Sequence, residues 1–130
     1  MITIKFRGLR IDGKGWVYGG YFQHTPDEDG VRYYIFDFNE GAVEVIPESV
    51  GQFTGLHDKN GKEIFEGEIL YNNDRKENCV VKYDEEKAMF IVEYLESKDK
   101  FTLWESISNL YYSVGNINEN QELLDKNLAD

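Results

Sequence analysis

Cysteine, histidine and long hydrophobic runs are scarce in this 130-residue sequence, and each scarcity excludes a class of protein. The one cysteine, Cys79, cannot form a disulfide within the chain, which predicts a reducing compartment. No apolar run approaches the roughly 20 residues that span a bilayer. The N-terminal residues also lack the pattern of a secretory signal. We therefore expect a cytoplasmic protein with no membrane segment.

Basic residues are also few. The chain has 14 Lys and Arg residues and 25 Asp and Glu residues, which gives a net charge of -11. Duplex DNA and anionic membranes would repel such a chain, so direct nucleic-acid binding is disfavoured. Residues 1–65 hold 7 basic and 10 acidic side chains, a net of -3, and residues 66–130 hold 7 and 15, a net of -8. The acidic second half motivates one hypothesis, an acidic mimic of nucleic acid.

Aromatic residues make up 15% of the chain and hydrophobic residues 41%, enough for the core of one domain. Short segments rich in β-branched and aromatic residues alternate with polar or glycine-containing turns. In the first segment, Ile2, Ile4 and Phe6 alternate as the inward side of a strand. We expect strands at residues 1–7, 16–22, 31–38, 42–46, 68–71, 79–83, 88–94 and 100–104.

This pattern predicts a mainly β protein of twisted antiparallel sheets that form a small barrel or sandwich. Within one domain, residues 1–130, we expect three parts in chain order. They are N-terminal strands with a glycine-rich motif (1–62), barrel-like strands (63–115, with an SH3-like segment at about 64–95), and a C-terminal helix and tail (116–130). Asn118 is the expected cap of a helix at 118–125. Gly19 and Gly20 indicate a bulge or a close backbone approach.

Three stretches resemble the YopX family of small phage and prophage proteins. The first joins residues 4–8 (IKFRG) and 16–19 (WVYG), and the second joins 50–56 (VGQFTGL) and 58–67 (DKNGKEIFEG). The third is the tail, 114–117 (VGNI) followed by Glu119, Asn120 and 122–124 (ELL). Glu68 and Gln121 depart from the family's usual Asp and Pro. The resemblance implies a β-dominated fold, expression inside a bacterial host and no established activity, so no catalytic residue is carried over.

The central motif allows two readings besides a structural one. Its glycines could cradle a phosphate, but Gly61-Lys62 is followed by Glu63 and not by the Ser or Thr of a phosphate loop. Asp58 could open a calcium loop, but Gly61 falls at position four and not at position six. We favour a tight turn at residues 58–62, with Thr54 and Gln52 bonded to backbone and with Phe53 and Leu56 in the core.

The candidate chemical groups are few and scattered. The acidic runs 27–29 and 84–86 are interpreted as solvated turns, with metal ligands of a hydrolase or nuclease as the alternative. Cys79 is interpreted as a small buried hydrophobe, although a pairing with His24 or His57 stays open. One Cys and two separated His residues fall short of a closed zinc site. We therefore predict no catalytic, cofactor or metal residues.

The aromatic run Tyr33, Tyr34, Phe36 and Phe38 is interpreted chiefly as core. A base-stacking platform would need a basic groove, which this segment lacks. If alternate rings emerge toward solvent, they could supply a protein interface instead. The leading hypothesis is a non-enzymatic accessory protein that binds a host or phage protein, and homo-oligomers are possible through exposed edge strands.

Overall fold

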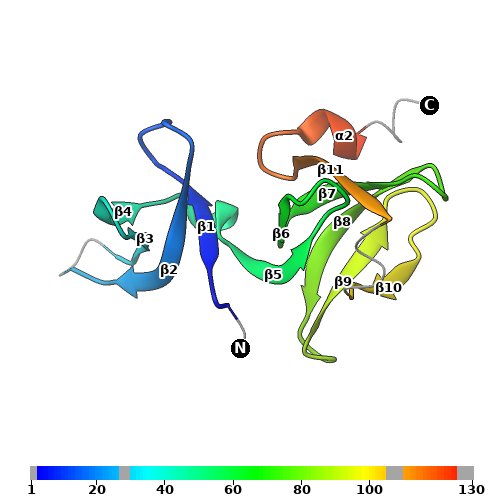
Figure 1. Cartoon of the computed structure of the whole chain (residues 1–130). Helices are drawn as coiled ribbons and strands as arrows, with labels where there is room; N and C mark the ends of the chain where they lie inside the picture. Colours follow the sequence, from blue (N-terminus) through cyan, green and yellow to red (C-terminus); the bar gives the residue numbers. More distant parts are fainter. Residues whose placement is uncertain (1–2, 27–29, 105–109, 126–130) are drawn as a thin grey trace. The chain divides into compact units, whose positions relative to one another are not determined.

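A computed structural model describes residues 3–26, 30–104 and 110–125, and antiparallel β-strands dominate these ranges (Figure 1). In chain order the strands are β1 (Phe6–Leu9), β2 (Trp16–His24), β3 (Arg32–Asp37), β4 (Gly41–Glu44), β5 (Gly51–His57), β6 (Glu63–Phe65), β7 (Glu68–Asn72), β8 (Glu77–Asp84), β9 (Met89–Tyr94), β10 (Lys100–Thr102) and β11 (Tyr111–Asn116). A 3-10 helix, η1 (Pro47–Ser49), precedes β5, and a short α-helix, α2 (Gln121–Asp125), follows β11. The prediction of a mainly β fold with a short C-terminal helix is confirmed.

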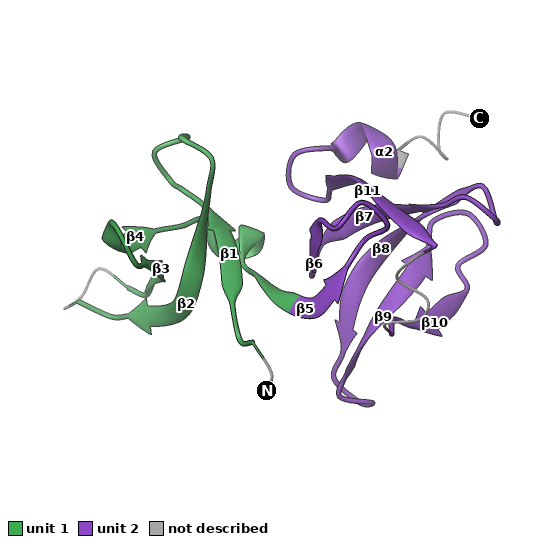
Figure 2. Ribbon diagram, viewed as in Figure 1, with its two compact units in different colours: residues 1–53 green, residues 54–130 purple. Residues whose placement is uncertain are grey.

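The chain divides into two compact units, residues 1–53 and 54–130 (Figure 2). In unit 1 the strands pair in the order β4-β3-β2-β1, and the start of β5 pairs with β1 through Gln52 and Gly51. An isolated bridge between Arg10 and Val45 joins the chain just after β1 to the chain just after β4. The expectation of a single domain with internal divisions stays a prediction.

The core of unit 1 is built by one face of this sheet. Val17, Ile35 and Val45 are buried together, from β2, β3 and the end of β4. Phe6, Tyr21, Tyr33, Val43 and Val50 pack against them. Because side chains alternate along a strand, the residues between these core positions lie on the opposite face. Ile4 was expected inside but is 71% exposed, since pairing with β2 begins only at Phe6.

Gly19 brings β2 and β3 unusually close together. A Cβ atom at this position would collide with the carbonyl oxygen of Phe36, whereas a Cβ at Gly20 would meet nothing within 4 Å. The predicted close backbone approach is therefore confirmed at Gly19. This packing leaves Gly20 on the outer face of the sheet, opposite Phe36.

Unit 2 contains a five-stranded antiparallel sheet in the order β10-β9-β8-β7-β11, and β6 pairs with β5. The turns after β7, β8 and β9 each place a residue other than glycine at positive φ, namely Lys76 (56°), Ala88 (52°) and Lys98 (65°). The strand order is that of a simple meander, made of β7, β8, β9 and β10. β11 pairs with the free side of β7 and forms one edge of the sheet. Whether this segment is SH3-like stays a prediction.

The main hydrophobic cluster of unit 2 lies on one face of the five-stranded sheet, while Ile69, Val80 and Ile91 are buried on the other. Its buried members come from β6 to β9, β11 and the chain after β10, and they are Ile64, Leu70, Cys79, Val81, Val92, Tyr94, Leu103 and Tyr111. Leu56 and Phe90 pack against this cluster. The predicted inward positions of Phe53, which is 6% exposed, and of Leu56 are borne out.

The C-terminal helix starts three residues later than predicted. The side-chain oxygen of Asn116 accepts hydrogen bonds from the N–H groups of Asn118 and Glu119, both at 3.0 Å. This local turn uses the residues that were expected to open the helix, so α2 begins at Gln121. The list of expected strands contains no segment of its own for β5, β6 or β11, although β6 and most of β11 lie within the expected barrel-like strands (63–115).

Candidate functional site

The outer face of the unit 1 sheet displays aromatic side chains. Tyr18 and Phe22 on β2 and Tyr34 and Phe36 on β3 lie on this face, because Phe22 is the cross-strand partner of Tyr34 and Gly20 that of Phe36. We call these four residues the outer aromatic face. Phe36 is 55% exposed, Tyr18 is 42% exposed and Phe22 is 40% exposed. The Phe22 and Tyr34 rings stack, with centroids 5.2 Å apart and planes 15° apart.

Phe38 extends this display into the turn after β3. The Asp37 carboxylate accepts hydrogen bonds from the N–H groups of Asn39 and Glu40, at 2.7 and 2.9 Å, and so fixes the turn. The Phe38 side chain is 96% exposed. The core interpretation of the aromatic run holds for Tyr33 and is wrong for Phe36 and Phe38, because strand alternation and the turn place them outside.

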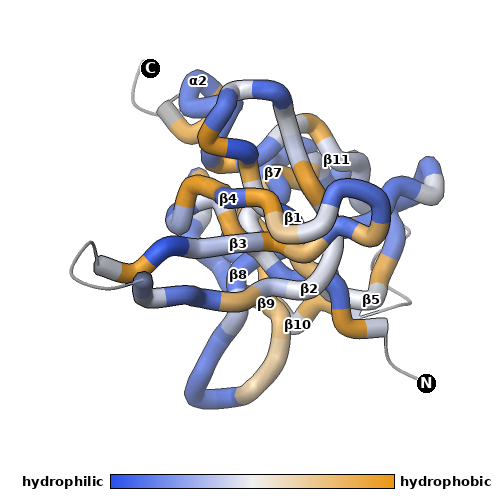
Figure 3. Tube along the Cα trace, turned by 90° about the vertical axis from the view of Figure 1, so that its left-hand side faces the viewer, coloured by the Kyte–Doolittle hydropathy of each residue, from blue (hydrophilic) through white to orange (hydrophobic). Residues whose placement is uncertain are grey.

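Glu44 on β4 lies on the same face, directly across from Tyr34. It is half-buried, and in the hydropathy colouring β4 shows a hydrophilic position flanked by hydrophobic ones (Figure 3). Among the residues that the structure describes, the Glu44 carboxylate makes no hydrogen bond or ion pair. A half-buried carboxylate is only partly hydrated, and a neighbouring aromatic ring can also attract a cation. The two groups together are therefore suited to bind one.

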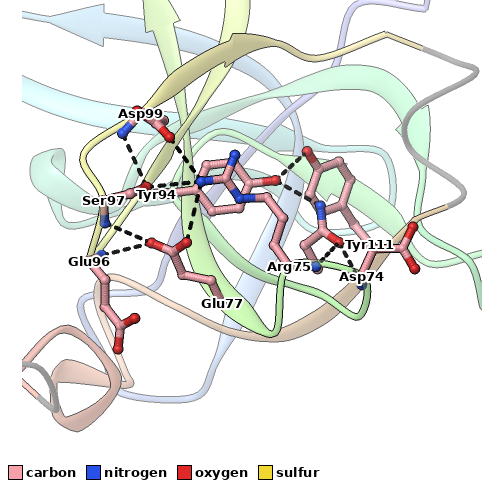
Figure 4. Close-up of polar contacts among 9 residues, drawn as sticks. Asp74, Arg75, Glu77, Tyr94, Glu96, Ser97, Asp99 and Tyr111 are labelled. Atoms are coloured by element: carbon pink, nitrogen blue, oxygen red, sulfur yellow. Dashed lines mark hydrogen bonds and ion pairs between the residues drawn. The ribbon is translucent and has the colours of Figure 1, made fainter.

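In unit 2 an arginine is held on an aromatic ring (Figure 4), as Arg7 is on Trp16 in unit 1, where the guanidinium lies 4.3 Å from the ring centroid. The Arg75 guanidinium lies 4.0 Å from the centroid of the Tyr94 ring. Its Nη2 donates to Ser97 Oγ at 3.1 Å and to Asp99 Oδ2 at 2.9 Å, and it lies 3.5 Å from Glu77 Oε2. We call Arg75, Glu77, Tyr94, Ser97 and Asp99 the Arg75 cluster.

The electrostatics of the Arg75 cluster favour its ionised form. The hydrogen bond with Asp99 raises the pKa of Arg75. Burial by itself would raise the pKa of Glu77, but the N–H groups of Ser97 and Glu96, which donate to its carboxylate, lower it overall. The cluster joins the turn at 73–76 to the turn at 95–99, so its groups satisfy one another and its role is structural.

Buried hydroxyls continue this network into the core. Asn72 Nδ2 donates to the Tyr94 hydroxyl at 2.8 Å, and that hydroxyl lies 3.0 Å from the hydroxyl of Tyr111 (Figure 4). Burial raises the pKa of Tyr111, and the hydrogen bond with Tyr94 adds to the rise. Tyr111 therefore stays neutral, and both tyrosines serve as hydrogen-bonded core residues.

The central motif forms a second polar cluster, the Asp58 cluster of Asp58, Lys62, Glu68 and Ser113. Asp58 Oδ1 accepts from the N–H groups of Asn60 and Lys62, and Asp58 Oδ2 accepts from the N–H group of Ser113, all at 2.9 Å. The predicted tight turn at 58–62 is confirmed. These N–H donors occupy the carboxylate oxygens that a calcium loop would offer to the ion.

Ser113 ties this turn to β7. Its hydroxyl donates to Glu68 Oε2 at 2.6 Å and accepts from Lys62 Nζ at 3.1 Å. Glu68 is 1% exposed, so its buried side-chain oxygens depend on hydrogen-bonding partners such as these. A carboxylate and an ammonium around a hydroxyl can in principle activate it, but here each group satisfies a neighbour in the fold.

Cys79 is inaccessible in the core of unit 2. Burial raises the pKa of its thiol to about 12, so the reactive thiolate is suppressed at neutral pH. The interpretation as a buried hydrophobe is confirmed. His24 at the end of β2 and His57 at the end of β5 are both exposed. Across residues 3–26, 30–104 and 110–125, no three His, Cys, Asp or Glu side chains gather so as to hold a metal ion.

The acidic run at 84–86 forms the turn between β8 and β9. Asp84 Oδ1 accepts from the N–H groups of Glu86 and Lys87, which supports the solvated-turn interpretation. The run borders an open depression of about 470 Å³. Glu93 in this depression is paired with Lys82 at 2.7 Å, and that hydrogen bond lowers the pKa of Glu93. The other run, residues 27–29, lies outside the described residues.

Three of the groups above were missed by sequence reasoning. Arg75 lies in a segment read only as a polar connection, and its hydrogen-bond partners Ser97 and Asp99 are 22 and 24 residues away. Ser113 falls in a strand that was not predicted. Glu44 could have been found, because strand alternation at 42–46 places it opposite the inward Val43 and Val45.

The described polar clusters of unit 2 are bonded within its own fold, and exposed rings occur in both units. The chain matches the family model described as YopX protein over residues 5–125. It therefore belongs to the YopX family. Its fold is similar to that of protein EF1440 from Enterococcus faecalis, whose crystal structure matches with a TM-score of 0.58 and 24% identity. That match covers 95% of this chain and 99% of the other.

No curated protein matches this chain. In the part of the chain that the structure describes, no helix is long and apolar enough to cross a membrane.

Proposed function

We propose that this protein is a phage or prophage accessory protein of the bacterial cytoplasm that binds a partner protein through the outer aromatic face. The observation that carries this proposal is the exposure of Phe36 and Phe38 beside the stacked Phe22 and Tyr34 rings on one unit. The partner is a protein of the host or of the phage.

Aromatic side chains exposed to water are unfavourable in free energy, and burying them against a partner is favourable. Contiguous exposed apolar area is rare on soluble monomers, and where it occurs it marks an interaction surface. Phenylalanine and tyrosine are enriched in the centres of interfaces, because they bury much area with few rotatable bonds. The sheet of unit 1 holds the rings in fixed register, which reduces the entropy lost on binding.

Affinity capture from a bacterial lysate tests the proposal. The wild-type chain and a Phe22→Ser/Phe36→Ser variant serve as baits, and Trp104→Ser is the matched control. Trp104 is 56% exposed in unit 2, almost the same as Phe36 in unit 1. We expect specific proteins to be lost with the double variant and retained with the control. Equal capture by all three folded baits would overturn the proposal.

A second candidate function is mimicry of nucleic acid by unit 2. Residues 54–130 hold 9 basic and 17 acidic side chains, a net of -8, against 5 and 8, a net of -3, for residues 1–53. A mimic would bind a DNA-binding protein with an affinity that falls steeply with salt, and duplex DNA would compete. Binding that is insensitive to salt would exclude it.

A further inference from the structure

Glu44 differs from the other acidic groups that the structure describes in unit 1, because it is half-buried and also lacks a side-chain partner among the described residues. Arg10 binds both Asp12, at 3.2 Å, and Glu40, at 2.7 Å, and its hydrogen bond lowers the pKa of Asp12. The Asp37 carboxylate is used by its own turn. The Glu44 carboxylate has no such partner among the described residues, although it is half-buried beside Tyr34.

The Arg75 cluster shows what this combination of groups binds. There, a tyrosine ring supplies a flat surface at 4.0 Å from the guanidinium, and an acidic side chain accepts one of its N–H groups at 2.9 Å. On unit 1, Tyr34 and Glu44 present the same two groups, a ring and a carboxylate, as cross-strand neighbours. Among the described residues, no arginine pairs with Glu44.

We propose that the outer aromatic face binds an arginine side chain from an extended segment of a partner protein. The guanidinium lies on the Tyr34 ring and pairs with Glu44, while Phe22 and Phe36 contact the residues beside the arginine. This inference rests on the proposed function and specifies the chemistry of its partner. The net charge of -11 would speed the approach of such a basic segment.

Arginine suits this site better than lysine does. A guanidinium is planar, stacks on rings and is less strongly hydrated than an ammonium, and it can offer two N–H groups to one carboxylate. Arg32 also lies on this face, two residues before Tyr34 and across from His24. Its positive charge opposes any incoming cation, so the Glu44 carboxylate and the Tyr34 ring must together outweigh it.

Peptide titration of the full chain, followed by backbone amide chemical shifts, tests the inference. The probes are an acetylated, amidated heptapeptide Gly-Val-Pro-Arg-Pro-Val-Gly and its counterpart with citrulline, which keeps the shape of arginine but removes the charge. We expect shifts on β2, β3 and β4, and about tenfold weaker binding of the citrulline peptide. Glu44→Gln should weaken the arginine peptide about tenfold and leave the citrulline peptide unchanged.

Glu48→Gln is the matched control, since Glu48 is an exposed acid of unit 1 that makes no side-chain bond among the described residues. Equal binding of both peptides, or an unchanged affinity in Glu44→Gln, would overturn the arginine site. If Phe36→Ser still abolished peptide binding in that case, the aromatic face would remain an interaction surface. No shifts at all would also overturn the arginine site, and the lysate capture would then decide the proposed function independently.

Discussion

In unit 2 the ring of Tyr94 is covered by Arg75, and the exposed rings of Tyr83 and Phe101 pack edge-on against Phe90 and Tyr94. In unit 1, Phe36 and Phe38 make no ring or cation contact with any residue that the structure describes. Both units are built of antiparallel strands, and each has a cluster of buried hydrophobic residues. Unit 2 therefore uses Arg75 and Tyr94 to hold its own turns, whereas unit 1 leaves Phe36 and Phe38 available.

The largest loss of stability is expected when the Asp58 carboxylate of unit 2 is removed. Asp58→Ala removes the acceptor of three N–H groups, so the free energy of unfolding of unit 2 should fall by about 3 kcal/mol. Urea denaturation measures it. Asp74→Ala, at an exposed acid with no side-chain bond among the described residues, should stay within about 0.5 kcal/mol. A small loss for Asp58→Ala would mean that unit 2 does not depend on this cluster.

Two adjacent glycines give a comparable test in unit 1. Gly19→Ala forces a Cβ against the carbonyl of Phe36 and should cost unit 1 about 2 kcal/mol, because β2 and β3 must separate. Gly20→Ala meets open space and should change stability by less than about 1 kcal/mol. Thermal unfolding of the two variants measures the difference. Equal midpoints would contradict the close packing of these strands.

Alkaline pH should destabilise unit 2 through its buried thiol. The pKa of Cys79 rises from 9.0 to about 12 on folding, so between these values the folded state keeps a proton that the unfolded state has lost. Stability is therefore intact below pH 9 and falls as the pH rises toward 12. Cys79→Ala should make stability less dependent on pH in this range. Part of the dependence should remain, because burial also raises the pKa of Tyr111. Denaturation between pH 8 and pH 11 gives the slopes, and identical slopes would contradict the assignment.

The smallest expected effect concerns metal ions. The Asp58 oxygens are taken by N–H donors and Glu93 is paired with Lys82, so titration calorimetry with Mg²⁺, Mn²⁺ or Ca²⁺ should give no binding heat. The thermal midpoint should not move either. A saturating heat would show that the acids of unit 2 are available after all, and would favour the hydrolase or nuclease alternative.

Local sequence was enough for the strands rich in β-branched and aromatic residues, such as β3 and β9. It failed for β5 and β11, because Gly51, Gly55 and Gly115 depress strand propensity and only pairing with distant strands compensates. Alternation could place Glu44 outward, but its lack of a partner depends on what the folded chain brings near it. The same holds for Arg75, whose ring and carboxylates come from other strands and turns.

Three turn residues of unit 2 with positive φ are positions where substitution can raise thermal stability. Lys76, Ala88 and Lys98 all occupy a backbone region that disfavours a side chain with a Cβ, at a cost of roughly 1 kcal/mol each. Glycine or asparagine at these positions would relieve that cost without touching the outer aromatic face. A thermostabilised variant made in this way would suit long titrations and crystallisation trials with a captured partner.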